Sequence, residues 1–304
     1  MFSVEKVREF FKGNISISEP LSRFTTFRIG GPADYYLEPK DREDLLKLIR
    51  YLKEIKYPYI IIGNGSNILI SDEGIRGAAI NLEAGFTKIE VNKNIVYAEA
   101  GIRLSKLVDV CIEHSLVGIE NLAGIPGTLG GAILMNAGAY GGEISDFIKL
   151  VEVIDDVEIK FLKKEECGFA YRKSNLEGKI ILSAEFELPY GDKAKAKERR
   201  KELLLKRNQS QPVELPNAGS IFKNPPGDYA ARLIEQAGLK GLTIGGAKVS
   251  EKHANFIVNF NNASASDVVE LMKIIQEKVY EKFGIMLEPE IKMLGFDKNK
   301  VIVE

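Results

Sequence analysis

The sequence predicts a folded α+β protein with two domains, and three observations support this prediction. The chain has 304 residues, which is enough for two domains with sizeable cores. Hydrophobic residues make up 45% and charged residues 28%, and both values are typical of folded soluble proteins. Helical and strand patterns alternate irregularly around a strand-rich middle region, unlike the regular alternation of a repeating βαβ array.

Charge and cysteine content exclude several functional classes. With 42 basic and 43 acidic side chains the net charge is -1, so bulk electrostatics do not predict nucleic-acid binding. Cys111 and Cys167 cannot form a disulfide framework, and we expect both to be small buried hydrophobes. The N-terminal residues lack the unbroken apolar core of a signal peptide, and the longest uncharged stretch, Asn121 to Gly142, is too rich in glycine for a membrane span. We therefore expect a cytoplasmic protein without a membrane or nucleic-acid partner.

The first third of the chain predicts a small α/β unit. Apolar residues between Val4 and Phe11 have helical spacing, and an extended stretch follows up to Pro39. Asp41 has the pattern of an N-cap for a helix whose apolar stripe runs to Ile55. Tyr59–Ile62 is a short apolar run, which predicts a buried strand leading into a glycine-rich turn.

Patterns in the rest of the chain predict further elements. Three more helices are expected over 104–115, 229–237 and 266–283. Strands are expected over 78–82, 88–91, 95–100, 148–154, 157–161, 180–188, 254–260 and 288–296. The uncharged segment 121–142 is predicted to be a loop. Because a basic stretch and two prolines follow Pro189, we expect one domain over 1–190, split into two subdomains near residue 76, and a second over 191–304.

Two glycine-rich segments are candidates for binding a nucleotide. Gly63-Asn64-Gly65 begins like a dinucleotide fingerprint, but Ile68 stands where the third glycine belongs, and a tight turn between two strands explains the segment equally well. The second segment, 121–142, is long and uncharged, and its glycines allow successive N–H groups to form a nest for phosphate oxygens. A pyrophosphate cradle for a dinucleotide cofactor is favoured there over a compact structural loop.

These segments, with others downstream, resemble the UDP-N-acetylenolpyruvoylglucosamine reductase family. The motifs occur in the family's order over nearly the whole chain: GNGSN from 63, GIPGTLGG from 124, MNAGAYGGE from 135, FAYRKS from 169, NAGSIFKNP from 217 and LEPEI from 287. The resemblance is to the shorter type of the family, which lacks an extra substrate-covering loop. NAGSIFKNP is the most specific of these motifs.

The resemblance implies a fold and a reaction. The first domain would be the FAD-binding half of the vanillyl-alcohol-oxidase type, built from two α+β subdomains, and the second a smaller C-terminal α+β substrate domain. The implied enzyme is a cytoplasmic oxidoreductase with non-covalent FAD and with NADPH as hydride-donating cosubstrate. It would reduce the enolpyruvyl group of a UDP-sugar to UDP-N-acetylmuramate, a precursor of peptidoglycan, and no oligomeric partner is implied.

The resemblance also assigns binding residues. The implied FAD contacts are Gly63, Asn64, Gly65, Ser66, Asn67, Gly124, Ile125, Pro126, Gly127, Thr128, Gly130, Gly131, Ala137 and Gly138. The implied substrate contacts are Tyr171, Lys223, Asn224 and His253. No histidine, cysteine and carboxylate cluster has the spacing of metal ligands, so no catalytic metal is expected.

Three residues match the chemistry of the implied reaction. Arg172 can hold a carboxylate bidentately and neutralise an enolate-like intermediate, with Glu290 as a partner in that task. Ser220 can donate a proton to the α-carbon as a general acid. Without the resemblance, these residues would be a surface arginine, a strand-end carboxylate and a turn serine.

Several alternatives stay open at the level of sequence. His253 is either a structural histidine or a substrate contact. The basic segment Asp192–Asn208 is interpreted first as a solvated helix face, second as a contact to the UDP diphosphate and last as a nucleic-acid contact. Ser210 stands where the family often has a basic residue, which speaks against the diphosphate contact. A related flavoprotein oxidase would share the glycine segments but has no reason to carry NAGSIFKNP with Glu290. A catalytically silent nucleotide-binding protein should have lost Arg172, Ser220 or Glu290.

Overall fold

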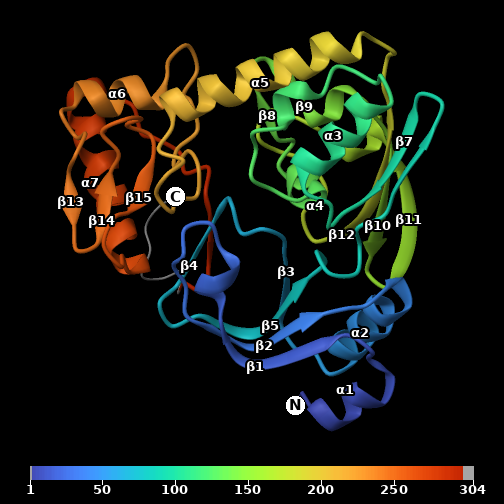
Figure 1. Cartoon of the computed structure of the whole chain (residues 1–304). Helices are drawn as coiled ribbons and strands as arrows, with labels where there is room; N and C mark the ends of the chain where they lie inside the picture. Colours follow the sequence, from blue (N-terminus) through green and yellow to red (C-terminus); the bar gives the residue numbers. More distant parts are fainter. Residues whose placement is uncertain (1, 297–304) are drawn as a thin grey trace. The chain divides into compact units, whose positions relative to one another are not determined.

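The computed structural model describes residues 2–296, which form a mixed α+β fold in two compact units (Figure 1). The first unit comprises the described residues up to Ser16 together with Tyr35–Asn64 and Gly77–Lys206. The second comprises Ile17–Asp34, Gly65–Arg76 and the described residues from Arg207 onward. The predicted fold class, α+β, is therefore confirmed.

The first unit begins with a helix-covered sheet. Strands β1 (Asn14–Pro20), β2 (Pro32–Glu38), β5 (Ile75–Asn81) and β3 (Tyr59–Ile62) form a four-stranded sheet in the order β1-β2-β5-β3, with β3 and β5 parallel. The helices α1 (Val4–Phe10) and α2 (Arg42–Glu54) share a hydrophobic core with β5. The predicted helices, the N-cap Asp41, whose side chain accepts from the Asp44 N–H, and the strand at 59–62 are all confirmed.

A second sheet completes the first unit. Five antiparallel strands lie in the order β11-β10-β12-β7-β6, and the helices α3 (Leu104–Glu113) and α4 (Leu129–Leu134) lie beside this sheet (Figure 1). The strands are β6 (Ile89–Asn92), β7 (Ile95–Glu99), β10 (Ile148–Asp155), β11 (Glu158–Lys163) and β12 (Ile180–Glu187). Side chains from both sheets belong to one hydrophobic core, so the two layers of this unit are packed together.

A buried polar cluster also joins the two layers of the first unit. Glu152 in β10 is 5% exposed and accepts hydrogen bonds from Arg42, at the start of α2, and from the Ser183 hydroxyl in β12. The Arg42 guanidinium also lies 3.7 Å from the Glu99 carboxylate. Because a buried carboxylate needs a partner, this cluster fixes where α2 sits on the five-stranded sheet.

The segment 121–142 is not a plain loop, so that prediction was wrong. It contains α4 and the strand β8 (Gly138–Ala139), and with β9 (Gly142–Glu143) this strand forms a short hairpin. Leu129, Ala132 and Ile133 are buried at helical spacing, but the surrounding glycines concealed the pattern. Short 3-10 helices flank the segment at Glu120–Leu122 and Ile144–Asp146.

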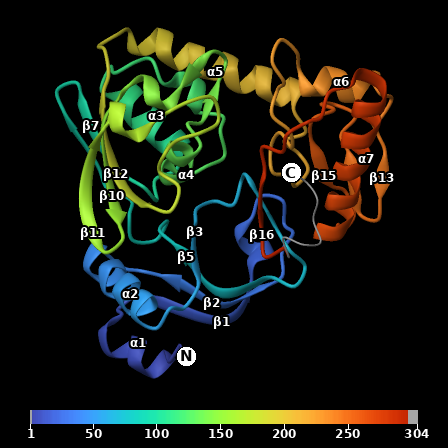
Figure 2. The same cartoon turned by 180° about the vertical axis from the view of Figure 1, so that it is seen from behind.

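The second unit has its own core. Strands β13 (Thr243–Ile244), β14 (Ala247–Val249) and β15 (Ile257–Asn259) form an antiparallel sheet, and α6 (Ala230–Gln236) and α7 (Ala265–Phe283) pack with it. Strand β4 (Ile68–Ile70) pairs in parallel with β16 (Lys292–Leu294), as Figures 1 and 2 allow the reader to follow. The 3-10 helix at Leu21–Phe24 belongs to this unit as well, and Phe27 and Ile29 from the N-terminal half lie in its core.

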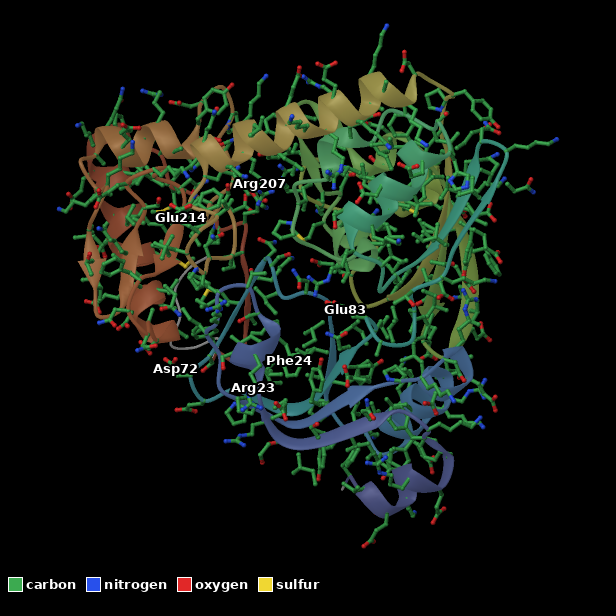
Figure 3. All side chains as sticks on the ribbon, in the orientation of Figure 1. Arg23, Phe24, Asp72, Glu83, Arg207 and Glu214 are labelled. Carbon is green, nitrogen blue, oxygen red and sulfur yellow. The ribbon has the colours of Figure 1, made fainter. Side chains whose placement is uncertain are left out.

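The units differ from the division expected from the sequence, which was contiguous and cut at residue 190. Helix α5 (Lys193–Ser210) belongs to the first unit up to Lys206, and residues 65–76 belong with the C-terminal part. Asp72, labelled in Figure 3, explains the second difference, because its carboxylate accepts from the N–H groups of Ala265 and Ser266 at the start of α7. Such long-range pairing has no local sequence signal.

Within residues 2–296, none of the helices combines the length and the apolar character needed to cross a bilayer.

Candidate active site

A cavity of about 80 Å³ lies in the first unit where the two glycine-rich segments meet. Its lining includes the end of β3, the residues that follow β5 and the start of α4. Four predicted cofactor contacts line it: Gly63, Thr128, Gly130 and Gly131. The fold therefore brings together two segments that the sequence shows about 60 residues apart.

Gly63 leaves no room for a side chain as long as Thr128 keeps its position. A Cβ placed there would lie 2.2 Å from the Thr128 hydroxyl oxygen, which is far inside van der Waals contact. The neighbouring Asn64 side chain donates to the Pro126 carbonyl at 2.6 Å, and the Asn81 side chain donates to the Gly63 carbonyl. These contacts hold the end of β3 closely against residues 126–128. A ligand in the cavity would therefore meet backbone at this wall, without an intervening side chain at Gly63.

The predicted nest of N–H groups is smaller than the sequence suggested. The N–H groups of Ile125, Gly127, Leu129 and Gly130 donate to backbone carbonyls of the protein at 2.7–3.0 Å. They are therefore not available to phosphate oxygens. The nest prediction now depends on the N–H groups of Gly124, Thr128 and Gly131.

The predicted catalytic residue of the first unit is Arg172. Its guanidinium donates to the Gly138 carbonyl at 2.8 Å and lies 5.0 Å from the centroid of the Tyr171 ring. Its backbone is left-handed, with φ at 54°, and Tyr171 is half exposed. The predicted cofactor contact Gly138 and the predicted catalytic arginine are thus direct neighbours.

The other two predicted catalytic residues lie together in the second unit. Ser220 follows Gly219, whose φ of 77° favours glycine, and the Glu290 N–H donates to the Ile221 carbonyl at 2.8 Å. The pairing places Ser220 one residue from the backbone partner of Glu290. Both side chains are partly exposed, so both can meet a ligand.

The rest of the first glycine motif belongs to this second group. Gly65, Ser66 and Asn67 are in the second unit, and the Asn67 side chain donates to the Glu290 carbonyl at 3.2 Å. A Cβ on Gly219 would lie 3.9 Å from the Ser66 carbonyl oxygen. The predicted cofactor contacts Ser66 and Asn67 therefore lie beside the predicted catalytic pair.

Two predicted substrate contacts have partners within the protein. The Lys223 ammonium forms an ion pair with Glu288, and the Lys223 N–H donates to the Glu288 carbonyl at 2.8 Å. The Asn224 side chain accepts from the Ala230 N–H at 3.0 Å and so supports the start of α6. For Asn224 in particular, the structure gives a local structural role that the sequence did not suggest.

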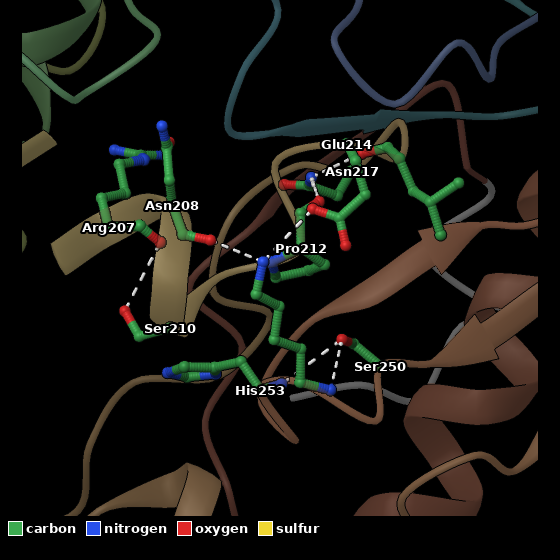
Figure 4. Close-up of polar contacts among 10 residues, drawn as sticks. Arg207, Asn208, Ser210, Pro212, Glu214, Asn217, Ser250 and His253 are labelled. Atoms are coloured by element: carbon green, nitrogen blue, oxygen red, sulfur yellow. Dashed lines mark hydrogen bonds and ion pairs between the residues drawn. The ribbon is translucent and has the colours of Figure 1, made fainter. Parts of the chain in front are cut away.

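His253, labelled in Figure 4, follows Lys252 in a loop after β14. Both backbone N–H groups donate to the Ser250 hydroxyl, and the Lys252 ammonium donates to the Asn208 carbonyl at 2.6 Å. The His253 ring stacks edge-on with Phe256, its Nδ1 is buried without a hydrogen-bond partner, and burial lowers its pKa. These features are those of a neutral, mainly structural histidine.

Sequence reasoning missed three asparagines that build the site. Asn136 is fully buried between the hairpin and the turn that carries Arg172. Asn255 exchanges hydrogen bonds with the backbone of Phe222 and accepts at its own carbonyl from the Ile221 N–H. Asn217 accepts from the Gly219 N–H and donates to two carbonyls. The quoted motifs contain Asn136 and Asn217, but a pattern does not distinguish a buried asparagine from a ligand contact.

Comparisons with known proteins agree with this geometry. Residues 33–157 match the FAD binding domain model, and residues 211–294 match the model of the UDP-N-acetylenolpyruvoylglucosamine reductase C-terminal domain. The UDP-N-acetylenolpyruvoylglucosamine reductase of Chloroherpeton thalassium is 47% identical, with 98% of this chain and 99% of the relative covered. That of Caldanaerobacter subterraneus is 48% identical, with 96% and 98% covered.

A solved structure points the same way. The crystal structure of UDP-N-acetylenolpyruvylglucosamine reductase from Thermus caldophilus superposes with a TM-score of 0.81 at 37% identity, covering 94% of this chain and 100% of that one. The predicted family and the predicted FAD cofactor are both confirmed. With this likeness over nearly its full length, the chain belongs to the UDP-N-acetylenolpyruvoylglucosamine reductase family and is a FAD-dependent oxidoreductase.

Proposed function

We propose that this protein uses NADPH to reduce the enolpyruvyl group of UDP-N-acetylglucosamine enolpyruvate and forms UDP-N-acetylmuramate. The observation that carries the proposal is the backbone hydrogen bond from Glu290 to Ile221, which keeps Ser220 and Glu290 together in the unit matched by the family's C-terminal domain. Bound FAD would accept a hydride from NADPH and deliver it to the terminal carbon of the enolpyruvyl group.

The first unit is proposed to hold the FAD. Gly63, Thr128, Gly130 and Gly131 would contact it, because they line one cavity and Gly63 leaves no room for a side chain. The N–H groups of Gly124, Thr128 and Gly131 would meet phosphate oxygens. The half-exposed Tyr171 would contact the substrate at the rim of this unit.

Arg172 is proposed to bind the carboxylate of the substrate. A guanidinium can donate to both carboxylate oxygens, and its charge opposes the negative charge that spreads onto the carboxylate when hydride arrives. Its bond to the Gly138 carbonyl orients the guanidinium. Such a preoriented charge costs little reorganisation during the reaction.

Ser220 is proposed to give a proton to the α-carbon. An enolate-like carbon is a strong base, so a hydroxyl within hydrogen-bond reach can act as the general acid. A protonated Glu290 would donate a hydrogen bond to the substrate carboxylate beside it. Lys223 and His253 remain proposed substrate contacts of the second unit, and Asn224 would act there through its support of α6.

An anaerobic titration of the FAD-loaded protein tests the proposal. NADPH should bleach the flavin absorbance, and UDP-N-acetylglucosamine enolpyruvate should then restore it. Bleaching without recovery would overturn the proposed substrate and favour a related flavoprotein with another acceptor. No bleaching by NADPH, with recovery after chemical reduction, would overturn only the proposed hydride donor.

A further inference from the structure

Asn136 is a fully buried polar residue in the middle of the first unit. Its exposed fraction is 0%, and its backbone is left-handed, with φ at 43°. The side-chain NH₂ donates to the Glu143 carboxylate at 2.7 Å and to the Ala170 carbonyl at 3.0 Å, and its oxygen accepts from the Ser145 N–H at 3.4 Å. A buried amide with this many partners fixes the three segments that it contacts.

One of these contacts reaches the backbone of the turn that carries Arg172. Ala170 and Lys173 exchange backbone hydrogen bonds at 2.9 and 3.1 Å, which close the turn around Tyr171 and Arg172. The φ of Arg172, 54°, is uncommon for a residue with a side chain and requires support from its surroundings. Through the Ala170 carbonyl, Asn136 supplies such support directly.

The hydrogen bond from Asn136 to Glu143 supports the hairpin that orients the Arg172 guanidinium. Glu143 pairs with Gly138 across the β8–β9 hairpin, and the Gly138 carbonyl accepts from Arg172 at 2.8 Å. Asn136 thus supports Arg172 in two ways. Its NH₂ group donates to Ala170, which belongs to the turn that carries the arginine backbone, and to Glu143, whose strand partner Gly138 orients the guanidinium.

We propose that Asn136 is a positioning residue for Arg172. This inference rests on the proposed function, in which Arg172 binds the substrate carboxylate. Loss of the NH₂ group would let the turn and the hairpin shift separately, and a shift of about 1 Å in a catalytic group can cost about 100-fold in rate. In this proposal Asn136 touches neither the substrate carboxylate nor the flavin, and its whole effect on the reaction passes through Arg172.

Two variants of the FAD-loaded protein test the proposal. Asn136→Asp keeps the shape and the acceptor for Ser145 but replaces the NH₂ donors by a carboxylate facing Glu143. Asn136→Gly removes the side chain while suiting the left-handed backbone, so it covers the case in which the aspartate variant does not fold. In either, we expect reoxidation of reduced flavin by the UDP-sugar to slow by about 10- to 100-fold, with FAD content and bleaching by NADPH unchanged within about twofold.

A double-mutant cycle separates positioning from general damage. In an Arg172→Ala background, Asn136→Asp should have almost no further effect on reoxidation, because the residue through which it acts is gone. Asn94→Asp is the matched control, since the Asn94 side chain also donates to a glutamate, Glu187, but on an exposed part of the same unit. It should leave both half-reactions unchanged.

Each outcome decides between distinct ideas. Normal reoxidation in Arg172→Ala would overturn the proposed role of the arginine in the main reaction. Slow reoxidation in Arg172→Ala but normal reoxidation in both Asn136 variants would overturn only the positioning role. Loss of FAD in both Asn136 variants, or a full further effect of Asn136→Asp in the Arg172→Ala background, would show that Asn136 acts on the fold in general.

Discussion

The two segments proposed to carry the chemistry are built in different ways. In the first unit, segment 121–143 has partners at short and intermediate separations along the chain: the Asn121 side chain donates to the Ala139 carbonyl, 18 positions away, and the Asn64 side chain donates to the Pro126 carbonyl, 62 positions away. In the second unit, segment 217–225 is held by distant partners, and the Asn217 carbonyl accepts from the Thr26 hydroxyl, 191 positions away. The comparison teaches that glycine content alone can point to the first kind of site, whereas the second is found by motif resemblance and its distant supporting contacts appear only in the folded chain.

The largest expected effect tests the second segment. Ser220→Ala removes the proposed proton donor while leaving the long-range backbone contacts of Ile221 in place. We expect reoxidation of reduced flavin by the UDP-sugar to slow by about 100- to 10,000-fold, because this is the usual contribution of a general acid. Stopped-flow absorbance after reduction with NADPH measures this rate.

A control variant distinguishes loss of the Ser220 hydroxyl from general destabilisation of the segment. Ala218, two residues earlier, is buried in the core of the second unit, so Ala218→Gly should lower the thermal unfolding temperature without selectively slowing reoxidation. A Ser220→Ala protein with normal turnover would remove the catalytic role from this segment. The long-range contacts would then have to be explained by folding alone.

A smaller effect, on FAD binding, is expected from a substitution at the closely packed Gly63. In Gly63→Ala the new Cβ would meet the Thr128 hydroxyl at 2.2 Å and the Thr128 Cβ at 3.2 Å, so the buried Thr128 side chain or the backbone around it must move. Overpacking of this kind costs about 1–3 kcal/mol in the free energy of unfolding. We expect FAD to bind at least about tenfold more weakly, measured by equilibrium titration of the apoprotein.

Gly131 provides the matched control for Gly63. It also lines the cavity, but a Cβ there would lie 3.6 Å from the Thr128 hydroxyl, an ordinary contact distance, and the residue is inside α4. Gly131→Ala should therefore raise the free energy of unfolding of the apoprotein by about 0.5–1 kcal/mol. If both alanine variants lose the same stability, the close approach of Gly63 is not the cause.

Much of the architecture could be predicted because its signals are local. Asp41 as an N-cap, the strand at 59–62 and the α7 region follow from spacing and residue type. Helix α4 was missed because its three buried residues lie among glycines, which lower helix propensity. The predicted nest in segment 121–142 is smaller than expected partly because the N–H groups of Leu129 and Gly130 donate to Ile102 and Ala100, which follow a different strand.

The division into units could not be predicted for a related reason. Residues 65–76 look like a continuation of the first α/β unit, yet β4 pairs with β16 and Asp72 supports the start of α7. Both contacts join residues about 200 positions apart, where a single sequence carries no signal. The candidate residues themselves were found through motif resemblance, whereas their supporting asparagines required the structure.

The smallest expected effect concerns the pH dependence of the second unit. Burial lowers the pKa of His253 below its ordinary value of 6.5, and nearby Lys240 lowers the pKa further, against an opposing effect of Glu235. The folded state therefore binds the proton more weakly than the unfolded chain does. The contribution of neutral His253 to the free energy of unfolding is therefore fully present above about pH 6.5, the ordinary pKa of the side chain in the unfolded chain. It is lost as the pH falls from 6.5 toward the lowered pKa of the folded protein.

Urea unfolding at about pH 8 and about pH 5.5 measures this contribution in the protein and in His253→Gln. The variant should lose less stability between the two pH values, because its neutral side chain has no proton to gain. Carboxylates such as Glu113, whose pKa is lowered to about 2 by Lys193 and Lys197, stay charged over this window and cancel in the comparison. Equal losses in both proteins would mean that the loop around His253, which contacts the second segment through Asn255, already opens to water before unfolding, so this distant support of the second segment would be weak.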